Sequence, residues 1–326
     1  MQNLAAVYRQ FGKPQEVVKA EDIGVQPLGE GQILAKLLRA PINPSDLGMI
    51  AGSYGSLKQL PAVAGREGVG VVVEAAKGAA IGVGRRVRLS AEAGCWQQYQ
   101  ILDSDKATAV PDNLDPDMEA MAFINPPTAL CVLEKFAKLK EGDWIIQNGA
   151  GSALGYFMIQ ICRSMCVKTV NMLRNAEAKR AELEKIGADI VVDEKDFDAK
   201  KIREITEGKL LLGLNQIGGE SVSNMIKAMG NSATVVTVGA MVSDPVRFPT
   251  RFLIFNDLRL RGFWWDKFQK TAPKEEIDRI FKKIFEMIES GALKAPVDSR
   301  FKIENISAAL ARASENSRSG KVMIEF

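Results

Sequence analysis

The chain has 326 residues, of which 46% are hydrophobic and 25% are charged, as in an ordinary globular protein. Its length predicts two domains, or one large domain with an insertion. The net charge of +3 is small and the charges are scattered, so they do not indicate a protein that binds nucleic acid or a membrane surface. No apolar run approaches the roughly 20 residues that a membrane-spanning helix needs. We therefore expect neither nucleic acid nor membrane as a partner.

The chain contains no histidine. This excludes Ser-His-Asp triads, Cys-His pairs, histidine-ligated zinc or haem, and histidine as a general acid. The four cysteines (Cys95, Cys131, Cys162 and Cys166) do not form a disulfide framework in a chain this long. We expect them to be buried, reduced thiols, and we expect no metal site. A proton donor must then be Tyr, Lys, Asp, Glu, Cys, a ribose hydroxyl or water.

The first 120 residues are predicted to be mostly β. Short strands at 32–38, 68–74 and 86–89 lie between turns rich in glycine and proline, which favours a partly open barrel over alternating α/β structure. The N-terminal residues lack the apolar region of a signal peptide and are predicted to form an opening strand. We therefore expect a cytoplasmic protein.

From about residue 121 to 263 the pattern changes to alternating strands and helices, which predicts a parallel sheet with helices on both faces. The strands are expected near 144–147, 169–173, 189–192, 210–214 and 233–238. Helices are predicted over 175–186 and, later, over about 275–289, before a β-rich tail that returns to the first domain. The chain is therefore predicted to be α/β, with one domain of residues 1–120 and 266–326 and another of residues 121–265.

A stretch at 144–174 has the order strand, small-residue turn, helix, strand. The turn at 148–154 leads into a helix predicted to begin near Ser152. Backbone N–H groups and the helix dipole at such a helix start form a site for a phosphate group. The stretch predicts a dinucleotide-binding unit, and the alternative is an ordinary βαβ unit with no ligand.

The glycine pattern in this turn is degenerate. Only Gly155 keeps the register of G-x-G-x-x-G, although Gly149 and Gly151 lie nearby and could form the tight turn. Arg174 closes the second strand, at the position where a carboxylate would bind the 2′-hydroxyl of NAD and an arginine suits the 2′-phosphate of NADP. The expected cofactor is NADPH.

The stretch from Pro41 to Gly70 carries a second set of motifs. Residues 43–46, with the sequence Asn-Pro-Ser-Asp, form a turn that also caps a helix. Tyr54 lies between glycines on a loop that we expect to be flexible and exposed. Further on, Gly65-Arg66-Glu67 leads into a strand.

These blocks, together with Asn-Pro-Pro-Thr-Ala at 125–129 and Arg-Gly-Phe-Trp-Trp at 261–265, resemble the medium-chain dehydrogenase/reductase superfamily over nearly the full length. Within it, the chain is similar to NADPH-dependent trans-2-enoyl-thioester reductases of the mitochondrial fatty-acid-synthesis type. The resemblance implies a GroES-like, partly open β-barrel domain and a Rossmann doubly wound domain. Zinc alcohol dehydrogenases have Gly-His-Glu at 65–67 and a cysteine-rich lobe. The chain lacks both and is predicted to be a zinc-free reductase.

By position, the resemblance implies that Tyr54 assists protonation. It also implies cofactor contacts from Asn125, Gly151, Ser152, Ala153, Leu154, Arg174, Asn175, Val238, Gly239, Ala240, Met241, Phe263, Trp264, Trp265 and Lys321. The family has Arg-Asp-Arg where residues 174–176 are Arg-Asn-Ala, which predicts a less strict preference for NADPH. Each of these assignments has an ordinary structural alternative: Tyr54 is a surface tyrosine, Arg174 a solvated arginine and Lys321 a surface lysine. For Trp264 and Trp265 the alternative is packing in which the adjacent side chains face opposite sides.

The resemblance therefore implies NADPH-dependent reduction of the C2=C3 bond of a trans-2-enoyl thioester in fatty acid metabolism, with hydride delivered to C3. Three alternatives stay open: a zinc-free NADPH:quinone oxidoreductase, an enone or acrylate reductase, and a non-catalytic NADPH-binding relative. The resemblance also implies a homodimer formed by Rossmann sheet edges. Residues 252–255, with the sequence Phe-Leu-Ile-Phe, are either an apolar contact near that edge or part of the core.

Overall fold

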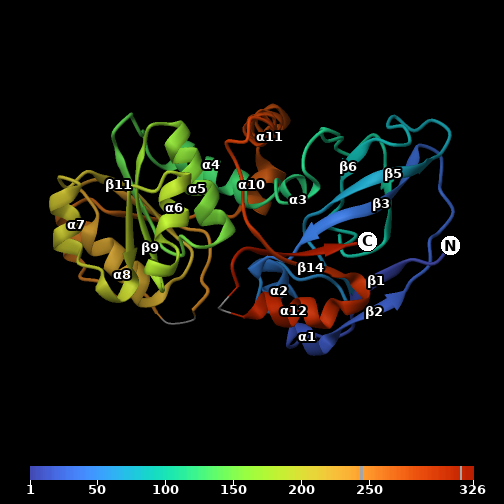
Figure 1. Cartoon of the computed structure of the whole chain (residues 1–326), viewed down its shortest axis with the longest axis horizontal. Helices are drawn as coiled ribbons and strands as arrows, with labels where there is room; N and C mark the ends of the chain where they lie inside the picture. Colours follow the sequence, from blue (N-terminus) through green and yellow to red (C-terminus); the bar gives the residue numbers. More distant parts are fainter. Residues whose placement is uncertain (243–244, 316–317) are drawn as a thin grey trace. The chain divides into compact units, whose positions relative to one another are not determined.

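The computed structural model describes residues 1–242, 245–315 and 318–326, and the chain divides into two compact units (Figure 1). The first unit consists of Met1–Phe123 and Ala295–Phe326, and the second of Ile124–Lys294. The first boundary lies close to the predicted residue 120. The second boundary comes later than the predicted residue 266.

Two helices of the second unit explain the later boundary. These are α10 (Trp265–Thr271) and α11 (Lys274–Glu289). Ion pairs join α11 to α4 (Asn125–Phe136), among them Lys135 with Glu276 at 2.6 Å and Arg279 with Glu134 at 2.7 Å. These partners lie far apart in the sequence, so local patterns could not assign α11 to its unit.

The first unit is built on two sheets. In the smaller, β1 (Leu4–Tyr8) pairs antiparallel with β2 (Val18–Asp22) and β4 (Ala62–Val63). The larger has the order β14-β15-β3-β5-β6, with β7 also paired to β3. Its strands are β3 (Gln32–Pro41), β5 (Val69–Ala75), β6 (Arg86–Arg88), β7 (Tyr99–Asp103), β14 (Val297–Lys302) and β15 (Lys321–Glu325). The predicted β-rich start and the returning tail are both present, since β15 pairs with β3.

Within the described residues of the first unit, the α-helices are α1 (Pro14–Val17), α2 (Pro44–Ala51), α3 (Pro116–Ala120) and α12 (Ile306–Ser314). The predicted cap at residues 43–46 is confirmed, because Asn43 precedes α2 and its side chain and that of Asp46 form a capping box. Apolar residues at alternate positions of β3, among them Ile33 and Leu37, are buried in the core.

The second unit holds one six-stranded sheet in the order β10-β9-β8-β11-β12-β13. All neighbouring strands are parallel. The strands are β8 (Trp144–Gln147), β9 (Lys168–Leu173), β10 (Ile190–Asp193), β11 (Leu210–Asn215), β12 (Thr234–Thr237) and β13 (Arg259–Gly262). Counted along the chain this is the order 3-2-1-4-5-6 of the dinucleotide-binding fold. The predicted strands agree with β8 to β12 to within one or two residues.

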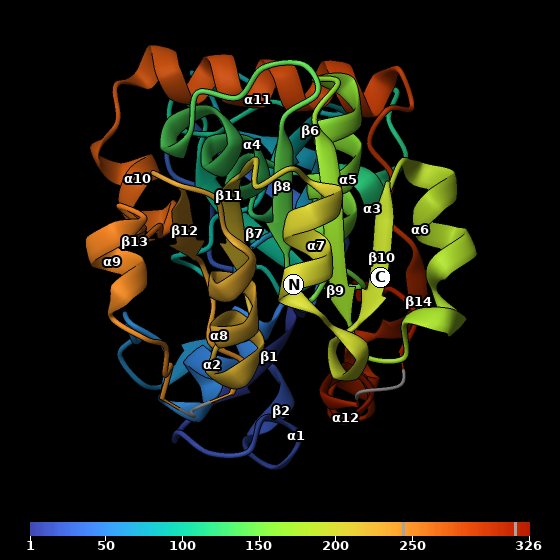
Figure 2. The same cartoon turned by 90° about the vertical axis from the view of Figure 1, so that its left-hand side faces the viewer.

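Helices cover both faces of this sheet, as the alternation predicted (Figure 2). On one face, α5 (Ala153–Ser164) and α6 (Arg180–Ile186) pack against β9 and β10. On the other, α7 (Ala199–Ile205) and α8 (Gly219–Ala228) share a core with β8, β9, β11 and β12. The sheet edge at β13 is preceded by α9 (Arg251–Phe255). No helix in the described residues is long and apolar enough to span a membrane.

The thiols follow the prediction at three positions. Cys95, Cys131 and Cys162 are buried and free, whereas Cys166 is free but exposed. The prediction of a buried thiol is therefore wrong for Cys166. Helix α5 ends at Ser164, and the backbone of Cys166 takes a φ of 54° in the turn before β9, which carries its side chain off the helix face.

Because Gly155 has no side chain, α5 can pack closely against the preceding turn. An added Cβ would lie 2.7 Å from the carbonyl carbon of Ala150, which is backbone and cannot move aside easily. We expect Gly155→Ala to lower the free energy of unfolding by about 2 kcal/mol through this overpacking. Urea denaturation checks the change, with Gly82→Ala as the control because a Cβ at Gly82 meets no atom within 4 Å. Equal stability of the two variants would contradict the steric argument.

Candidate functional site: a nucleotide cleft and a tyrosine held by an arginine

The predicted phosphate turn lies between β8 and α5. Gly149 has a φ of 62°, in the left-handed region that favours glycine, and the turn ends at Ser152, the N-cap of α5. The Ser152 hydroxyl accepts a hydrogen bond from the Gly155 N–H at 3.0 Å and donates one to Gln216 at 2.8 Å. The first N–H groups of a helix have no partner inside it, so Ala153 and Leu154 present backbone donors suited to a phosphate.

Buried amides join the ends of β8 and β11 beside this turn. The side chain of Asn148 donates to Asn215 at 2.9 Å and accepts from the backbone N–H of Gln216 at 2.7 Å. Gln216 in turn donates to the Asn148 carbonyl at 2.9 Å. Because Gln216 also holds Ser152, this network fixes the helix start relative to two central strands.

The segment Val238–Met241 follows β12 at the same edge of the sheet. The Val238 N–H donates to the Asn215 carbonyl at 3.0 Å, and Gly239 lies against the Gln216 backbone, from which an added Cβ would be 3.0 Å away. The structure therefore brings Gly239 close to the residues that hold the phosphate turn. Ala240 and Met241 are exposed.

The two predicted tryptophans face different surroundings, because the extended backbone ends at Trp264 and helix α10 begins at Trp265. Trp265 is 4% exposed and packs on Phe268 and Phe281, whereas Trp264 is 38% exposed. The Phe263 N–H donates to the Thr237 carbonyl at 3.0 Å, which places this segment beside the end of β12. Trp265 is thus a core residue. Of the two tryptophans, Trp264 has more exposed surface with which to contact a cofactor. Asn125, at the first turn of α4, is half-buried.

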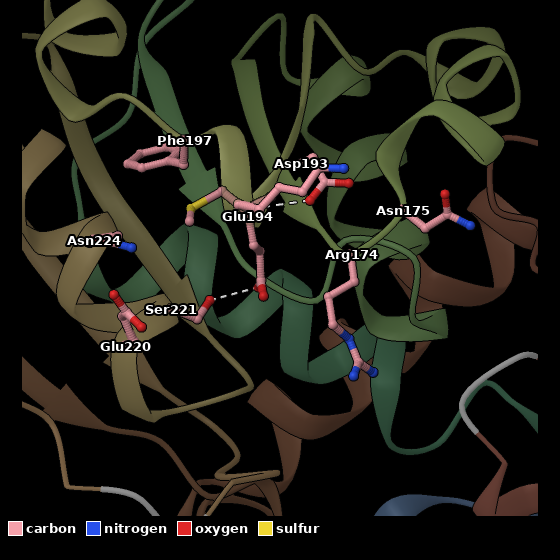
Figure 3. A pocket seen from close by; sticks show the side chains of 10 residues that line it. Arg174, Asn175, Asp193, Glu194, Phe197, Glu220, Ser221 and Asn224 are labelled. Carbon is pink, nitrogen blue, oxygen red and sulfur yellow. Dashed lines mark hydrogen bonds between the residues drawn. The ribbon is translucent and has the colours of Figure 1, made fainter.

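A cavity of about 590 Å³ lies beyond the carboxyl ends of β9 and β10 (Figure 3). Arg174, Asn175 and Asp193 lie on one side of it, and Glu220, Ser221 and Asn224 of α8 lie on the other. The remaining lining residues are Met172, Glu194, Lys195 and Phe197. The position at strand ends, next to a helix start suited to phosphate, is the one in which dinucleotide-binding sheets hold adenosine.

Some of the charged side chains that line the cavity form hydrogen bonds with other groups of the protein. Asp193 accepts from the backbone N–H groups of Ala176 and Lys195, and these bonds lower the pKa of its carboxyl. Glu194 accepts from the Ser221 hydroxyl at 2.7 Å. Arg174 and Lys195 supply the positive charge among the residues that line the cavity. Sequence reasoning missed Lys195, whose place just after the next strand end, β10, could have indicated it.

Tyr54 belongs to the first unit, on the loop after α2. Its hydroxyl accepts a hydrogen bond from Arg66 Nη1 at 2.9 Å, and the Arg66 guanidinium carbon lies 4.5 Å from the centre of the tyrosine ring. Arg66 is 5% exposed and Tyr54 is half-buried. The loop was predicted to be flexible and exposed, but the structure gives its tyrosine a fixed, charged partner. Sequence reasoning noted Arg66 only as the replacement for a histidine.

Lys321, also in the first unit, is 7% exposed and donates through Nζ to Asn43. Asn43 donates in turn to Glu67 at 2.7 Å, and Glu67 also accepts from the Phe123 N–H at 3.3 Å. Burial raises the pKa of the Glu67 carboxyl and lowers that of the Lys321 amine, against the attraction between the two groups. This buried network ties β15 to α2, which is a structural role. The cofactor contact of Lys321 stays a prediction.

Asp46 gives the first unit a pH-dependent stability. Burial raises the pKa of its carboxyl from 3.8 to about 6, so the native state keeps a proton that the unfolded chain has released between these values. Stability contributed by this group therefore falls as the pH rises through that window. Asp46→Asn can keep the acceptor for the Asn43 N–H, 2.7 Å from Asp46 Oδ2 in the native structure, without the ionisable group.

We expect Asp46→Asn to gain stability relative to the native sequence by about 2 kcal/mol on going from pH ~4 to pH ~7. Urea denaturation of both proteins at the two pH values measures this difference. Parallel pH profiles would show that Asp46 does not titrate as its burial requires.

Comparisons with known proteins agree with this architecture. Residues 29–112 match the alcohol dehydrogenase GroES-like domain family, and residues 153–282 match the zinc-binding dehydrogenase family. A mitochondrial enoyl-[acyl-carrier-protein] reductase of Xenopus tropicalis is 33% identical over 93% of this chain and 90% of its own length. One of Caenorhabditis elegans is 36% identical over 79% of this chain and 77% of its own length.

Solved structures show the same fold. The Etr1p–NADP–crotonyl-CoA complex has a TM-score of 0.90 and 25% identity, and it covers 100% of both chains. The Etr1p/Etr2p heterodimer, a mitochondrial 2-enoyl thioester reductase of Candida tropicalis, has a TM-score of 0.89 and 26% identity, with 100% of both chains covered. A mycobacterial quinone oxidoreductase has a TM-score of 0.83 and 24% identity, covering 99% of this chain and 100% of that chain, and shows the fold alone.

The fold and the nucleotide cleft define an oxidoreductase of two domains, GroES-like and Rossmann, that uses a nicotinamide cofactor. The chain belongs to the medium-chain dehydrogenase/reductase superfamily, with the enoyl-[acyl-carrier-protein] reductases as its relatives. In residues 1–242, 245–315 and 318–326, no group of three or more Cys, Asp or Glu side chains is arranged to hold a metal ion. That the enzyme works without zinc stays a prediction.

Proposed function

We propose that this protein uses NADPH to reduce the C2=C3 double bond of a trans-2-enoyl thioester. The observation that carries the proposal is the Tyr54 hydroxyl, which accepts a hydrogen bond from a buried arginine in a chain whose relatives are enoyl reductases. A quinone reductase needs no such proton-donating tyrosine. Likeness to an Etr1p complex that contains NADP and crotonyl-CoA supports both cofactor and substrate class.

The cofactor site fits NADPH in its donors and its charge. The start of α5 offers backbone N–H groups for the pyrophosphate, and Arg174 and Lys195 line the cavity where the adenosine phosphate would lie. Three carboxylates, Asp193, Glu194 and Glu220, line the same cavity, and two of them are bonded to protein groups. The preference for NADPH over NADH therefore depends on Arg174 and Lys195, and we propose that it is incomplete.

When bound, NADPH supplies the hydride that adds to C3, and the electron pair of the double bond moves to the thioester oxygen as an enolate. In this proposal Tyr54 donates a hydrogen bond to that oxygen and assists transfer of a proton to C2. Arg66 keeps the tyrosine oxygen occupied as an acceptor. The saturated thioester leaves with one hydride and one proton added.

Loss of reduced-nicotinamide absorbance tests the proposal directly. Purified protein receives NADPH or NADH with trans-2-butenoyl-CoA, with butanoyl-CoA as the saturated control, or with a small quinone. We expect fast NADPH oxidation with the enoyl-CoA alone. Turnover with the quinone alone would overturn the proposal in favour of a quinone reductase, and an enone as the sole acceptor would favour an enone reductase. NADPH binding with no turnover on any acceptor would identify a non-catalytic relative.

We also propose a homodimer in which two copies pair along β13. All four residues of this edge strand are exposed, and Leu260 on it is 44% exposed. On the adjacent α9, Ile254 is 70% and Phe255 80% exposed, whereas Phe252 of the same segment is buried. An apolar patch beside an open strand edge suits a second copy, and a related reductase forms a heterodimer. Light scattering after size exclusion tests this, and Phe255→Glu should shift a dimer to a monomer.

We keep the prediction of a cytoplasmic protein in fatty acid metabolism. The support for fatty acid metabolism is that the relatives are acyl-carrier-protein reductases. The same relatives are named mitochondrial, so cell fractionation with an antibody to the chain is the test of the compartment.

A further inference from the structure

Arg66 and Tyr54 meet in two ways at once. The guanidinium donates to the phenol oxygen at 2.9 Å, and its central carbon lies 4.5 Å from the ring centre, within the range of a cation–π contact. Arg66 is almost fully buried, with 5% of its surface exposed. A buried arginine that both bonds and stacks on one side chain restricts that side chain in position and in rotation.

The direction of this hydrogen bond leaves the tyrosine able to donate. A guanidinium has donors only, so the Tyr54 oxygen must be the acceptor. The hydroxyl hydrogen of Tyr54 is therefore not used in the contact with Arg66. The arrangement suits a hydroxyl that has to present its hydrogen to a negatively charged oxygen.

The backbone of the loop around Tyr54 does not by itself hold the tyrosine in one position. Gly52 has a φ of 80° and ends α2, and Gly55 follows the tyrosine. Glycines on both sides widen the backbone choices of the loop. A catalytic group must be held close to its productive geometry, so the restraint has to come from outside the loop.

The backbone at Arg66 is held firmly. Gly65 has a φ of 94°, and an added Cβ there would lie 2.7 Å from Cγ of Trp96, which is fully buried. The Cys95 N–H donates to the Gly65 carbonyl at 3.0 Å. On the other side, Glu67 is bonded to Asn43 at 2.7 Å. Asp46 adds an attractive charge toward Arg66. The backbone of Arg66 is thus held in a fixed position in the core of the first unit.

We propose that Arg66 is the positioning residue for Tyr54: it holds the phenol ring in place and directs the hydroxyl hydrogen toward the enolate oxygen. This inference rests on the proposed enoyl reduction. It adds that the arginine found where zinc alcohol dehydrogenases have a histidine acts on the reaction only through the tyrosine. Arg66 itself need not touch the substrate.

A double-mutant cycle tests the inference. We expect Arg66→Gln to lower kcat about tenfold with KM for NADPH unchanged, and to lower it less than twofold when Tyr54 is already changed to Phe. Arg66→Lys keeps the charge and one donor but not the planar fork, so its kcat should fall between those of the native enzyme and Arg66→Gln. Equal losses from Arg66→Gln in both backgrounds would overturn the inference.

A second measurement does not depend on turnover. The chain has four tyrosines, so labelling the phenol carbon with ¹³C gives few signals, and Tyr54→Phe assigns one of them. Arg66→Gln should move the Tyr54 signal and leave those of Tyr8, Tyr99 and Tyr156 in place. The control is Arg85→Gln, an exposed arginine paired with Asp112, which should move none of the four. An unmoved Tyr54 signal in Arg66→Gln overturns the inference.

The two experiments separate the two proposals. If no enoyl thioester is reduced by the native enzyme but Arg66→Gln moves the Tyr54 signal, the proposed substrate fails while the positioning contact stands. If the native enzyme reduces the thioester and the Tyr54 signal stays fixed in Arg66→Gln, the function stands and the role of Arg66 fails. Movement of all four signals would mean general unfolding and would also count against a specific positioning role.

Discussion

Tyr54→Phe is expected to lower kcat for enoyl thioester reduction by about 10² or more, within the range of a positioned acid catalyst. The phenylalanine keeps the ring beneath the Arg66 guanidinium, 4.5 Å from its centre in the native structure, and removes the hydroxyl alone. The variant therefore loses the hydrogen bond donor to the enolate with little change in packing. Steady-state kinetics with NADPH and trans-2-butenoyl-CoA measures the loss.

The matched control is Tyr99→Phe. Tyr99 belongs to the same unit and is half-buried on β7, but it is not among the predicted site residues. We expect its kcat to stay within twofold of the native value. KM for NADPH should stay unchanged in both variants, because neither hydroxyl belongs to the nucleotide cleft. Native turnover in Tyr54→Phe would remove the tyrosine from the mechanism and weaken the choice of an enoyl thioester over a quinone.

Features that depend on local patterns could be predicted well from the sequence. The strands β8 to β12 follow short apolar runs, and Ser152 caps α5 where the small-residue turn ends. Buried parallel strands and helix starts each carry their own signal within a few residues. The alternation also predicted a parallel sheet with helices on both faces, but not the order of its strands, because more than one order satisfies the same right-handed crossovers.

Contacts between distant segments could not be predicted in the same way. Lys321 lies 278 residues from Asn43, yet the two are bonded in the core of the first unit. The pairing of Lys135 with Glu276 likewise decides where α11 belongs. Such pairs depend on the register of whole strands and helices, and one sequence carries no direct signal for them. For the same reason the sequence indicated Tyr54 but not the role of Arg66.

Burial also changes the roles that can be assigned to residues predicted from the resemblance to contact the cofactor. Trp264 and Trp265 are adjacent, but the structure buries one and exposes much of the other. Lys321 is predicted to contact the cofactor, and its amine is engaged inside a network of Asn43 and Glu67. A resemblance assigns a position to a site, and only the local packing shows how much of a side chain is available there.

Arg174→Ala is expected to weaken NADPH binding about 10- to 100-fold and to change NADH binding less than twofold. Arg174 closes β9 and lines the cavity of the second unit, on the same side as Asn175 (Figure 3). Its planar fork suits the 2′-phosphate, which NADH lacks, and a charge-assisted bidentate bond is among the stronger polar contacts. Fluorescence titration with each reduced cofactor measures both constants.

Two further variants make this result specific. Lys185→Ala removes an exposed cation of the nearby α6 that does not line the cavity, so it should change neither constant. Lys195→Ala removes the second cation that does line it, and we expect a smaller loss for NADPH, because an ammonium is a single point of charge. Equal losses of NADPH and NADH in Arg174→Ala would place the arginine on a part that both cofactors share. An effect of Lys195→Ala larger than that of Arg174→Ala would move the phosphate toward β10, since Lys195 follows that strand and Arg174 follows β9.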